Sequence, residues 1–282
     1  MRALALTIFA AFLLSTAALT QVLNQNPHFQ DRAEVRHGAN SATVVANSPR
    51  PLEQAVQGVS EEYGWTVDFE DPPYFSSKDV VDATAPAWRA QHPNAKGVTL
   101  IKGGAFQSQF PEHPGAAHSD KDEEAVLNKL VNDYNQSGNP GKFSVRREGP
   151  DRFAIISTGV ADEAGTTKDV RPILDTPISI PQQSRDGIAT LQAILFELSS
   201  QSGTSVEPGL IPMNLFARTN AVFGGPGVPA RTLLQQVMSA TGQKLYWKLL
   251  YDTDGKRYFL NLLPVQQAQY DAFGNRTTVF VK

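Results

Sequence analysis

Residues 52–69 read LEQAVQGVSEEYGWTVDF, and residues 191–207 read LQAILFELSSQSGTSVE. In each stretch three aliphatic residues lie 12, 8 and 5 positions before a glycine, and a valine with an acidic neighbour follows that glycine. Aliphatic residues at this spacing share one face of a helix, and glycine commonly ends a helix. Each stretch therefore predicts a helix followed by a strand, and the repetition predicts an internal duplication.

A second apolar pattern recurs later in each half. Four residues at helical spacing have four counterparts: Val126, Leu127, Leu130 and Val131, then Leu233, Leu234, Val237 and Met238. We expect a β-hairpin after each of these helices, the second one around Asp254-Gly255, and we expect Ser184 to cap the helix before residue 203. The predicted fold class is α+β. It consists of two related small modules, each a short sheet with two helices packed on one face, in the order β-α-β-β-α-β-β.

The length of 282 residues agrees with two such modules. The expected segments are a signal peptide over 1–20, a flexible leader over 21–40, module 1 over 41–158 with a long insert at about 71–97, a linker over 159–172, module 2 over 173–264, and a C-terminal tail or edge strand over 265–282.

The first twenty residues have the charge order of an export signal. Arg2 precedes an uncharged apolar run over 3–14, and small residues follow over 15–18. We expect cleavage between about Ala18 and Asn24 and a periplasmic or secreted location. A signal that is retained as a membrane anchor is the open alternative. No other segment is long and apolar enough to span a bilayer.

Composition narrows the function classes. The chain has no cysteine, which excludes disulfides, a lipid-modified cysteine and cysteine-based metal sites. Its formal net charge of −3 gives no basic footprint for nucleic acid.

The insert at about 71–97 is the largest difference between the halves, and it is rich in proline and aromatic residues. Long structureless loops are uncommon in compact domains unless they carry a function. We therefore hypothesise that Trp88, Tyr74 and Phe75 form a binding site, since aromatic side chains dominate binding hot spots. The alternative is a lid whose aromatic residues pack on their own module.

Two further motifs have a chemical interpretation. His113, His118 and Asp120 could hold a zinc ion, with His92 as a further ligand, although their spacing matches no standard ligand pattern. The glycine-rich stretch 224–227 precedes a helix as phosphate loops do. It lacks the Gly-Lys-Ser/Thr ending, so we expect a tight turn there. We predict no metal and no cofactor.

Residues 229–247 read PARTLLQQVMSATGQKLYW, and residues 51–69 carry the first helix and strand pattern. These stretches resemble the short N-terminal (STN-like) domain of secretins and TonB-dependent receptors. In that family a helix, a Thr-Gly stop and two strands follow one another in this order. The resemblance implies a periplasmic protein-interaction module. No β-barrel, plug or secretin pore follows before Lys282, so we do not expect a role in gating an outer-membrane pore.

The sequence thus favours an exported, non-enzymatic binding protein of the bacterial cell envelope that engages another envelope protein. Two alternatives stay open. One is an exported hydrolase that uses the insert as a substrate lid, although no Gly-x-Ser-x-Gly motif occurs. The other is a glycan-binding or small-ligand-binding protein that uses Trp88 and Tyr74.

Overall fold

The computed structural model describes residues 29–112 and 120–281. The main elements of the first half are β1 (Glu34–His37), β2 (Ser41–Ser48), α2 (Pro51–Tyr63), β3 (Thr66–Glu70), β6 (Gly104–Pro111), α4 (Asp120–Gln136), β7 (Lys142–Gly149) and β8 (Arg152–Ala161). Between β3 and β6 lie a short 3-10 turn (Ser77–Asp79), β4 (Val80–Asp82), α3 (Pro86–Gln91) and β5 (Thr99–Ile101).

The second half follows β9 (Thr167–Asp169) and a second 3-10 turn (Ile173–Asp175). Its elements are β10 (Pro177–Asp186), α5 (Gly187–Ser202), β11 (Val206–Pro208), α6 (Met213–Ala217), β12 (Asn220–Pro229), α7 (Ala230–Ala240), β13 (Leu245–Asp252) and β14 (Arg257–Pro264). A hairpin of β15 (Gln266–Tyr270) and β16 (Arg276–Phe280) follows.

The two halves carry the same three strand pairings. In the first half β2 pairs antiparallel with β6, β3 pairs parallel with β8, and β7 pairs antiparallel with β8. In the second half β10 pairs antiparallel with β12, β11 pairs parallel with β14, and β13 pairs antiparallel with β14. The predicted α+β class is confirmed.

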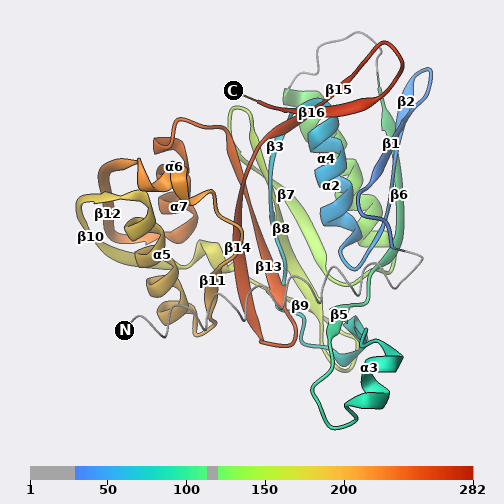
Figure 1. Cartoon of the computed structure of the whole chain (residues 1–282), viewed down its shortest axis with the longest axis horizontal. Coiled ribbons are helices and arrows are strands. Elements are labelled where there is room, and N and C mark those ends of the chain that lie inside the picture. The colour runs from blue at the N-terminus through green and yellow to red at the C-terminus, as the bar shows by residue number, and fades with distance from the viewer. Residues whose placement is uncertain (1–28, 113–119, 282) are drawn as a thin grey trace.

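The two helices of each half cover one face of the central sheet, as we predicted, but the prediction lacked a second sheet on their other side. In each half they lie between two sheets (Figure 1). In the first half Val44 of β2 and Phe106 of β6 share a core with Val67 and Phe69 of β3. The physical reason is that α2 and α4 bury apolar side chains against each other, against the small outer sheet and against the central sheet. A single sheet would leave part of that surface in water.

One central sheet joins the halves, because β3 pairs in parallel with β13. The strand order is β11-β14-β13-β3-β8-β7. The helices of the first half cover one face of this sheet and those of the second half cover the other (Figure 1). Strand β8 accordingly buries Phe153 and Ile155 in the first core and Ala154 and Ile156 in the second. The first half therefore contributes β8 side chains to the second core, and the partly buried Leu250 of β13 packs against the first core.

Several predicted boundaries differ from the structure. Strand β1 lies in the segment predicted to be a flexible leader, where it pairs with β2. The end of β8 and the whole of β9 lie in the predicted linker. The segment predicted as a tail or edge strand is the β15–β16 hairpin. The glycine-rich stretch 224–227 lies inside β12, where the ladder with β10 shifts register, so it is neither a turn nor a phosphate loop.

Candidate binding site

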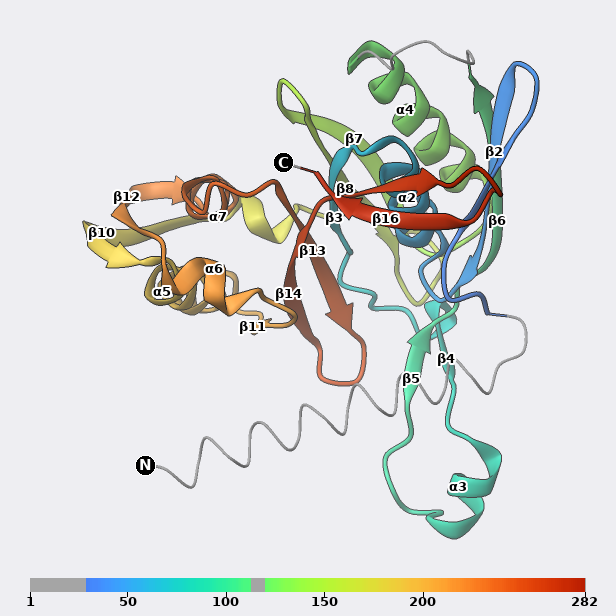
Figure 2. The same cartoon turned by 45° about the horizontal axis from the view of Figure 1, so that its top comes forward.

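The insert forms an arm that projects from the two cores. Strands β4 and β5 pair antiparallel, α3 lies between them in sequence, and the arm extends away from the central sheet (Figure 2). Polar contacts around Arg89 close its tip. The guanidinium donates to Asp82 Oδ2 at 2.6 Å through Nη2 and to the carbonyl of Ala95 at 2.9 Å through Nη1. No residue of α3 is buried, so the tip is held by hydrogen bonds and not by an apolar core.

Trp88 lies on α3 and is 41% exposed. Its ring stacks on His92, with 4.8 Å between the ring centroids and 26° between the planes. The stack fixes one face of the indole and leaves an ordered aromatic surface at the tip. A large ring that is ordered without being buried is the kind of side chain that anchors an interface.

The other two predicted residues lie in different surroundings. Phe75 is 64% exposed and borders an open groove against the β8–β9 turn, whose lining includes Val160, Ala161 and Ala164. Tyr74 is buried in the second core. Its hydroxyl lies 3.4 Å from Asp71 Oδ1, and burial raises the pKa of the phenol. Phe75 and Trp88 thus belong to candidate surfaces, whereas Tyr74 packs inside and is not presented to a ligand.

The root of the arm is fixed by both halves. Leu100 and Ile101 of β5 are buried. The β13–β14 turn of the second half reaches across to the arm, where the Thr99 amide donates to Asp254 Oδ2 at 3.0 Å and Thr253 Oγ1 donates to the carbonyl of Thr99 at 3.0 Å. The Lys96 ammonium donates to the carbonyl of Asp254 at 2.7 Å. The arm therefore has a defined direction.

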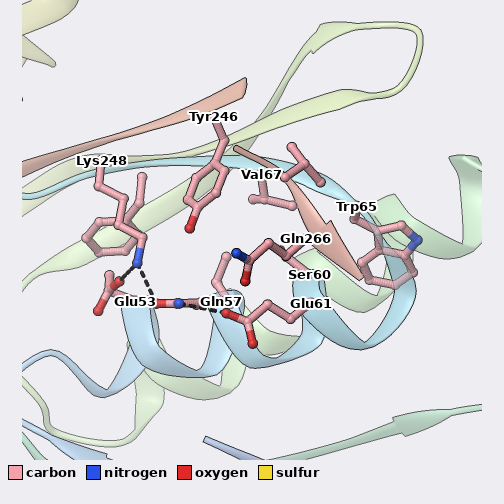
Figure 3. Close-up of a pocket in the computed structure, with 12 residues that line it drawn as sticks. Glu53, Gln57, Ser60, Glu61, Trp65, Val67, Tyr246, Lys248 and Gln266 are labelled. Carbon is pink, nitrogen blue, oxygen red and sulfur yellow. Dashed lines mark hydrogen bonds and ion pairs between the residues drawn. The ribbon is translucent and has the colours of Figure 1, made fainter. Parts of the chain in front are cut away.

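A small cleft lies between α2, β13 and β15 (Figure 3). Lys248 of β13 donates to Glu53 and to Gln57 Oε1 on α2. The cavity holds about 20 Å³, which is room for about one water molecule. Ser60 Oγ is buried at this place without a hydrogen-bond partner among the described residues. A cavity of this volume has no room for a substrate, and Lys248, which lines it, is already paired with Glu53.

The predicted zinc ligands fall largely outside the structure. His113 and His118 lie outside the described residues, and the side chain of Asp120 is not described. Among the residues that are described, no group of three His, Asp or Glu side chains is arranged to hold a metal ion. The His92 ring stacks on Trp88 in the arm.

A row of buried acids on and beside β3 was not predicted from the sequence. Asp68 binds Arg152, with 2.7 Å between Oδ2 and Nη1, and accepts the Trp247 amide at 2.9 Å. Glu70 Oε2 lies 2.7 Å from Arg231 Nη2.

Asp71, just past β3, is paired in the same way. Its Oδ2 lies 2.6 Å from Arg50 Nε and accepts the Tyr251 amide at 3.0 Å. Burial raises the pKa of all three carboxyl groups, Asp68, Glu70 and Asp71, and the facing arginines oppose that shift. Each of these acids binds a group of the second half, so we infer that they hold the two halves together. The sequence signal that could have indicated this role is the pair of acids at alternate positions of the predicted strand, Asp68 and Glu70.

No protein-family model, no curated protein and no solved structure matches this chain. Over the described part of the chain, no helix has the length and apolar character needed to cross a bilayer.

Proposed function

We propose that this protein is an exported binding protein of the bacterial cell envelope that engages another envelope protein through the arm. One observation carries the proposal: the arm presents Trp88 stacked on His92 at a tip that contributes no residue to either core. An aromatic residue that the fold does not need for packing is available for a partner. The export signal and the likeness of residues 229–247 to the short N-terminal domain of secretins support the same function.

The direction of the arm fits a role in docking to a partner better than it fits a role as the substrate lid of a hydrolase. A lid has to fold over a catalytic cleft, whereas this arm extends away from the central sheet (Figure 2). Its root is anchored by Asp254 and Thr253, which holds the tip out from the body. A tip held in place loses little conformational entropy when a partner binds.

The test is a capture experiment with a matched control. The mature chain is immobilised and exposed to envelope extract, and the protein it retains is identified. Trp88→Ala is compared with Phe196→Ala, which removes an aromatic ring that is 72% exposed on α5. We expect Trp88→Ala to weaken binding by about 2 kcal/mol or more, which is roughly thirtyfold, with an unchanged melting temperature.

Phe196→Ala is expected to bind as the wild type does. Equal capture by both variants would contradict the proposal. A lower melting temperature of Trp88→Ala with unchanged binding per folded molecule would show that the ring packs on its own chain instead.

A further inference from the structure

The β15–β16 hairpin forms a two-stranded ribbon across the outside of α2 (Figures 1 and 2). The Tyr270 hydroxyl donates to Glu62 Oε2 at 2.8 Å, and Arg276 Nη2 lies 3.1 Å from Glu61 Oε2. These contacts fix the ribbon on the helix. It nonetheless leaves large apolar side chains exposed: Tyr270, Phe273, Val279 and Phe280.

One edge of this ribbon has free backbone groups. Among the described residues β16 pairs with β15 alone. The two bonds that flank the ladder are those from the Val281 amide to the Val265 carbonyl and from the Asp271 amide to the Asn275 carbonyl. Hydrogen-bonded positions alternate along an antiparallel strand, so the odd-numbered residues of β16 bond inward to β15. Successive residues of an antiparallel strand direct their backbone groups to opposite sides. Arg276, Thr278 and Phe280 therefore direct their amide and carbonyl groups outward.

Both outer edges of the central sheet have some backbone groups occupied or missing, in contrast to β16. On β11 the Val206 amide donates to Ser199 Oγ at 2.9 Å, and Pro208 has no amide hydrogen. On β7 the Phe143 amide donates to Asn135 Oδ1 at 3.0 Å, and Asn135 Nδ2 donates to the Phe143 carbonyl at 2.8 Å. Proteins commonly protect edge strands by such side chains, by proline or by charge.

The outer edge of β16 has no proline, and among the described residues no side chain bonds to its outward backbone groups. Its sequence is RTTVF, without proline, and Arg276 is its single charged residue. A weakly protected edge that lies beside a central sheet with protected edges indicates an interaction surface.

We propose that β16 pairs antiparallel with β16 of a second copy of this chain, around a twofold axis at Thr278. In this register the outward-facing residues of one copy meet those of the other, so that Thr278 lies opposite Thr278 and Arg276 lies opposite Phe280. The exposed Phe280 ring of one copy then lies beside Arg276 of the other, whose guanidinium stays paired with Glu61 and Glu62 of its own chain.

The register also decides between the two strand orientations. A parallel in-register pairing would place Arg276 beside Arg276, and like charges at that distance repel. The antiparallel pairing uses the same patch on both copies, so it closes at a dimer and does not extend into a filament. The edge of β16 is separate from the arm, and its pairing does not depend on the function proposed for Trp88.

The test is the oligomeric state of the mature chain by sedimentation equilibrium. We expect the wild type and Thr278→Val to have the mass of two chains. We expect Thr278→Pro and Thr278→Lys to have the mass of one chain, because proline removes an outward amide and lysine places two like charges on the axis. Neither change removes a hydrogen bond to β15. Trp88→Ala is expected to stay dimeric.

A cross-link gives a second measurement that does not depend on those variants folding well. The chain has no cysteine, so Thr278→Cys introduces a single thiol. Directly opposed residues of hydrogen-bonded strands lie within the reach of a disulfide. We expect Thr278→Cys to form a covalent dimer at least tenfold faster than Phe273→Cys, whose position in the hairpin turn is more exposed but lies away from the axis.

Three results would overturn the proposal. The first is a wild type that sediments as one chain at every soluble concentration. The second is a dimer that Thr278→Lys leaves intact and in which both thiols cross-link equally fast, because that dimer uses another surface. The third is a monomer whose capture of an envelope protein is lost in Thr278→Lys and kept in Trp88→Ala, because the edge then serves a different protein.

Discussion

His37 lies between two carboxylates from different elements. Its Nδ1 is 2.9 Å from Glu112 Oε2, which follows β6, and its Nε2 is 3.1 Å from Glu62 Oε1 on α2. Tyr63 donates to the first carboxylate and Tyr270 to the second, and Arg276 lies near Glu62. Burial lowers the pKa of His37, but the hydrogen bonds and charges of Glu112 and Glu62 outweigh it, so the pKa is raised. The protonated ring can donate to both acids at once.

His37→Gln should remove a pH-dependent part of the stability. A group whose pKa is raised by folding stabilises the protein fully below its unfolded pKa of about 6.5, and this contribution disappears as the pH rises through the folded value. The melting temperature of the wild type should therefore exceed that of His37→Gln most near pH 6, and the difference should shrink toward pH 9. His92→Gln is the control, because the His92 ring contacts the Trp88 carbonyl and, among the described residues, no carboxylate. A constant difference between the wild type and His37→Gln would contradict the role of the charge.

Leu130→Ala should destabilise the fold by about 2–5 kcal/mol, because the side chain is fully buried on α4 and its removal leaves a cavity. Leu210→Ala removes the same atoms from an exposed position and should change the free energy of unfolding by less than about 0.5 kcal/mol. Denaturant unfolding of both variants measures the two values. Similar losses for the two leucines would show that Leu130 is not a core residue in solution.

At the scale of single residues the sequence predicted apolar burial well and paired charge poorly. Helical spacing identified Leu130 and Val237, and both are fully buried. Acids in a strand pattern usually face water. Asp68 and Glu70 are buried because Arg152 and Arg231 reach them from 84 and 161 residues away. No local pattern encodes partners at that distance.

At the scale of the elements, the sequence predicted where the helices end, but it predicted the wrong capping residue for α5. Gly64 and Gly203 both end their helices in the left-handed conformation, with φ of 74° and 69°. The cap of α5 is Asp186 and not Ser184, because the Ala189 amide donates to Asp186 Oδ1 at 2.7 Å. Ser184 lies in β10. Residue type alone could not show which of Ser184 and Asp186 is the cap, because serine and aspartate cap helices equally well.

The arm was the least predictable element. Its aromatic residues predicted a binding site, but nothing local distinguished Tyr74, which enters the core, from Phe75, which does not. The difference arises because the chain passes over the second half at this point, and Tyr258 and Tyr74 both reach Asp71 there. The side chain of Tyr74 therefore lies in the core, whereas that of the next residue, Phe75, faces the solvent.

Gly97→Ala should loosen the tip of the arm without unfolding the body. A Cβ at this position would lie 2.0 Å from Arg89 Nη2 and 2.4 Å from Thr84 Oγ1, so the guanidinium must leave Asp82. The tip shares no core with the body, and the global melting temperature should therefore be nearly unchanged. Amide exchange in α3 should become at least tenfold faster. Gly149→Ala, where the nearest atom is 3.7 Å from the new Cβ, is the control. Unchanged exchange in α3 would contradict the role of Arg89.

For the whole molecule, the repeated pairings explain how two modules make one body. The helix and hairpin patterns predicted two units but not the joint between them, because the β3–β13 pairing depends on side chains from both halves. Arg231 of α7 lies 2.9 Å from Asp175 Oδ1 through Nε, in addition to its contact with Glu70, and its guanidinium lies 4.9 Å from the centre of the Trp247 ring. One buried cation thus connects both halves and the segment between them.

Arg231→Met should therefore destabilise both halves together. Removing one partner of a buried ion pair leaves an uncompensated charge at Glu70 and costs about 3–5 kcal/mol. The double variant Arg231→Met with Glu70→Leu should recover part of that loss, since no buried charge then lacks a partner. Arg257→Met breaks the exposed contact with Glu207 and should cost about 1 kcal/mol or less. Because the central sheet is shared, amide exchange at Leu130 in the first half and at Val237 in the second should accelerate by the same factor in Arg231→Met. Acceleration at Val237 alone would show that the halves unfold independently and that the shared sheet does not couple them.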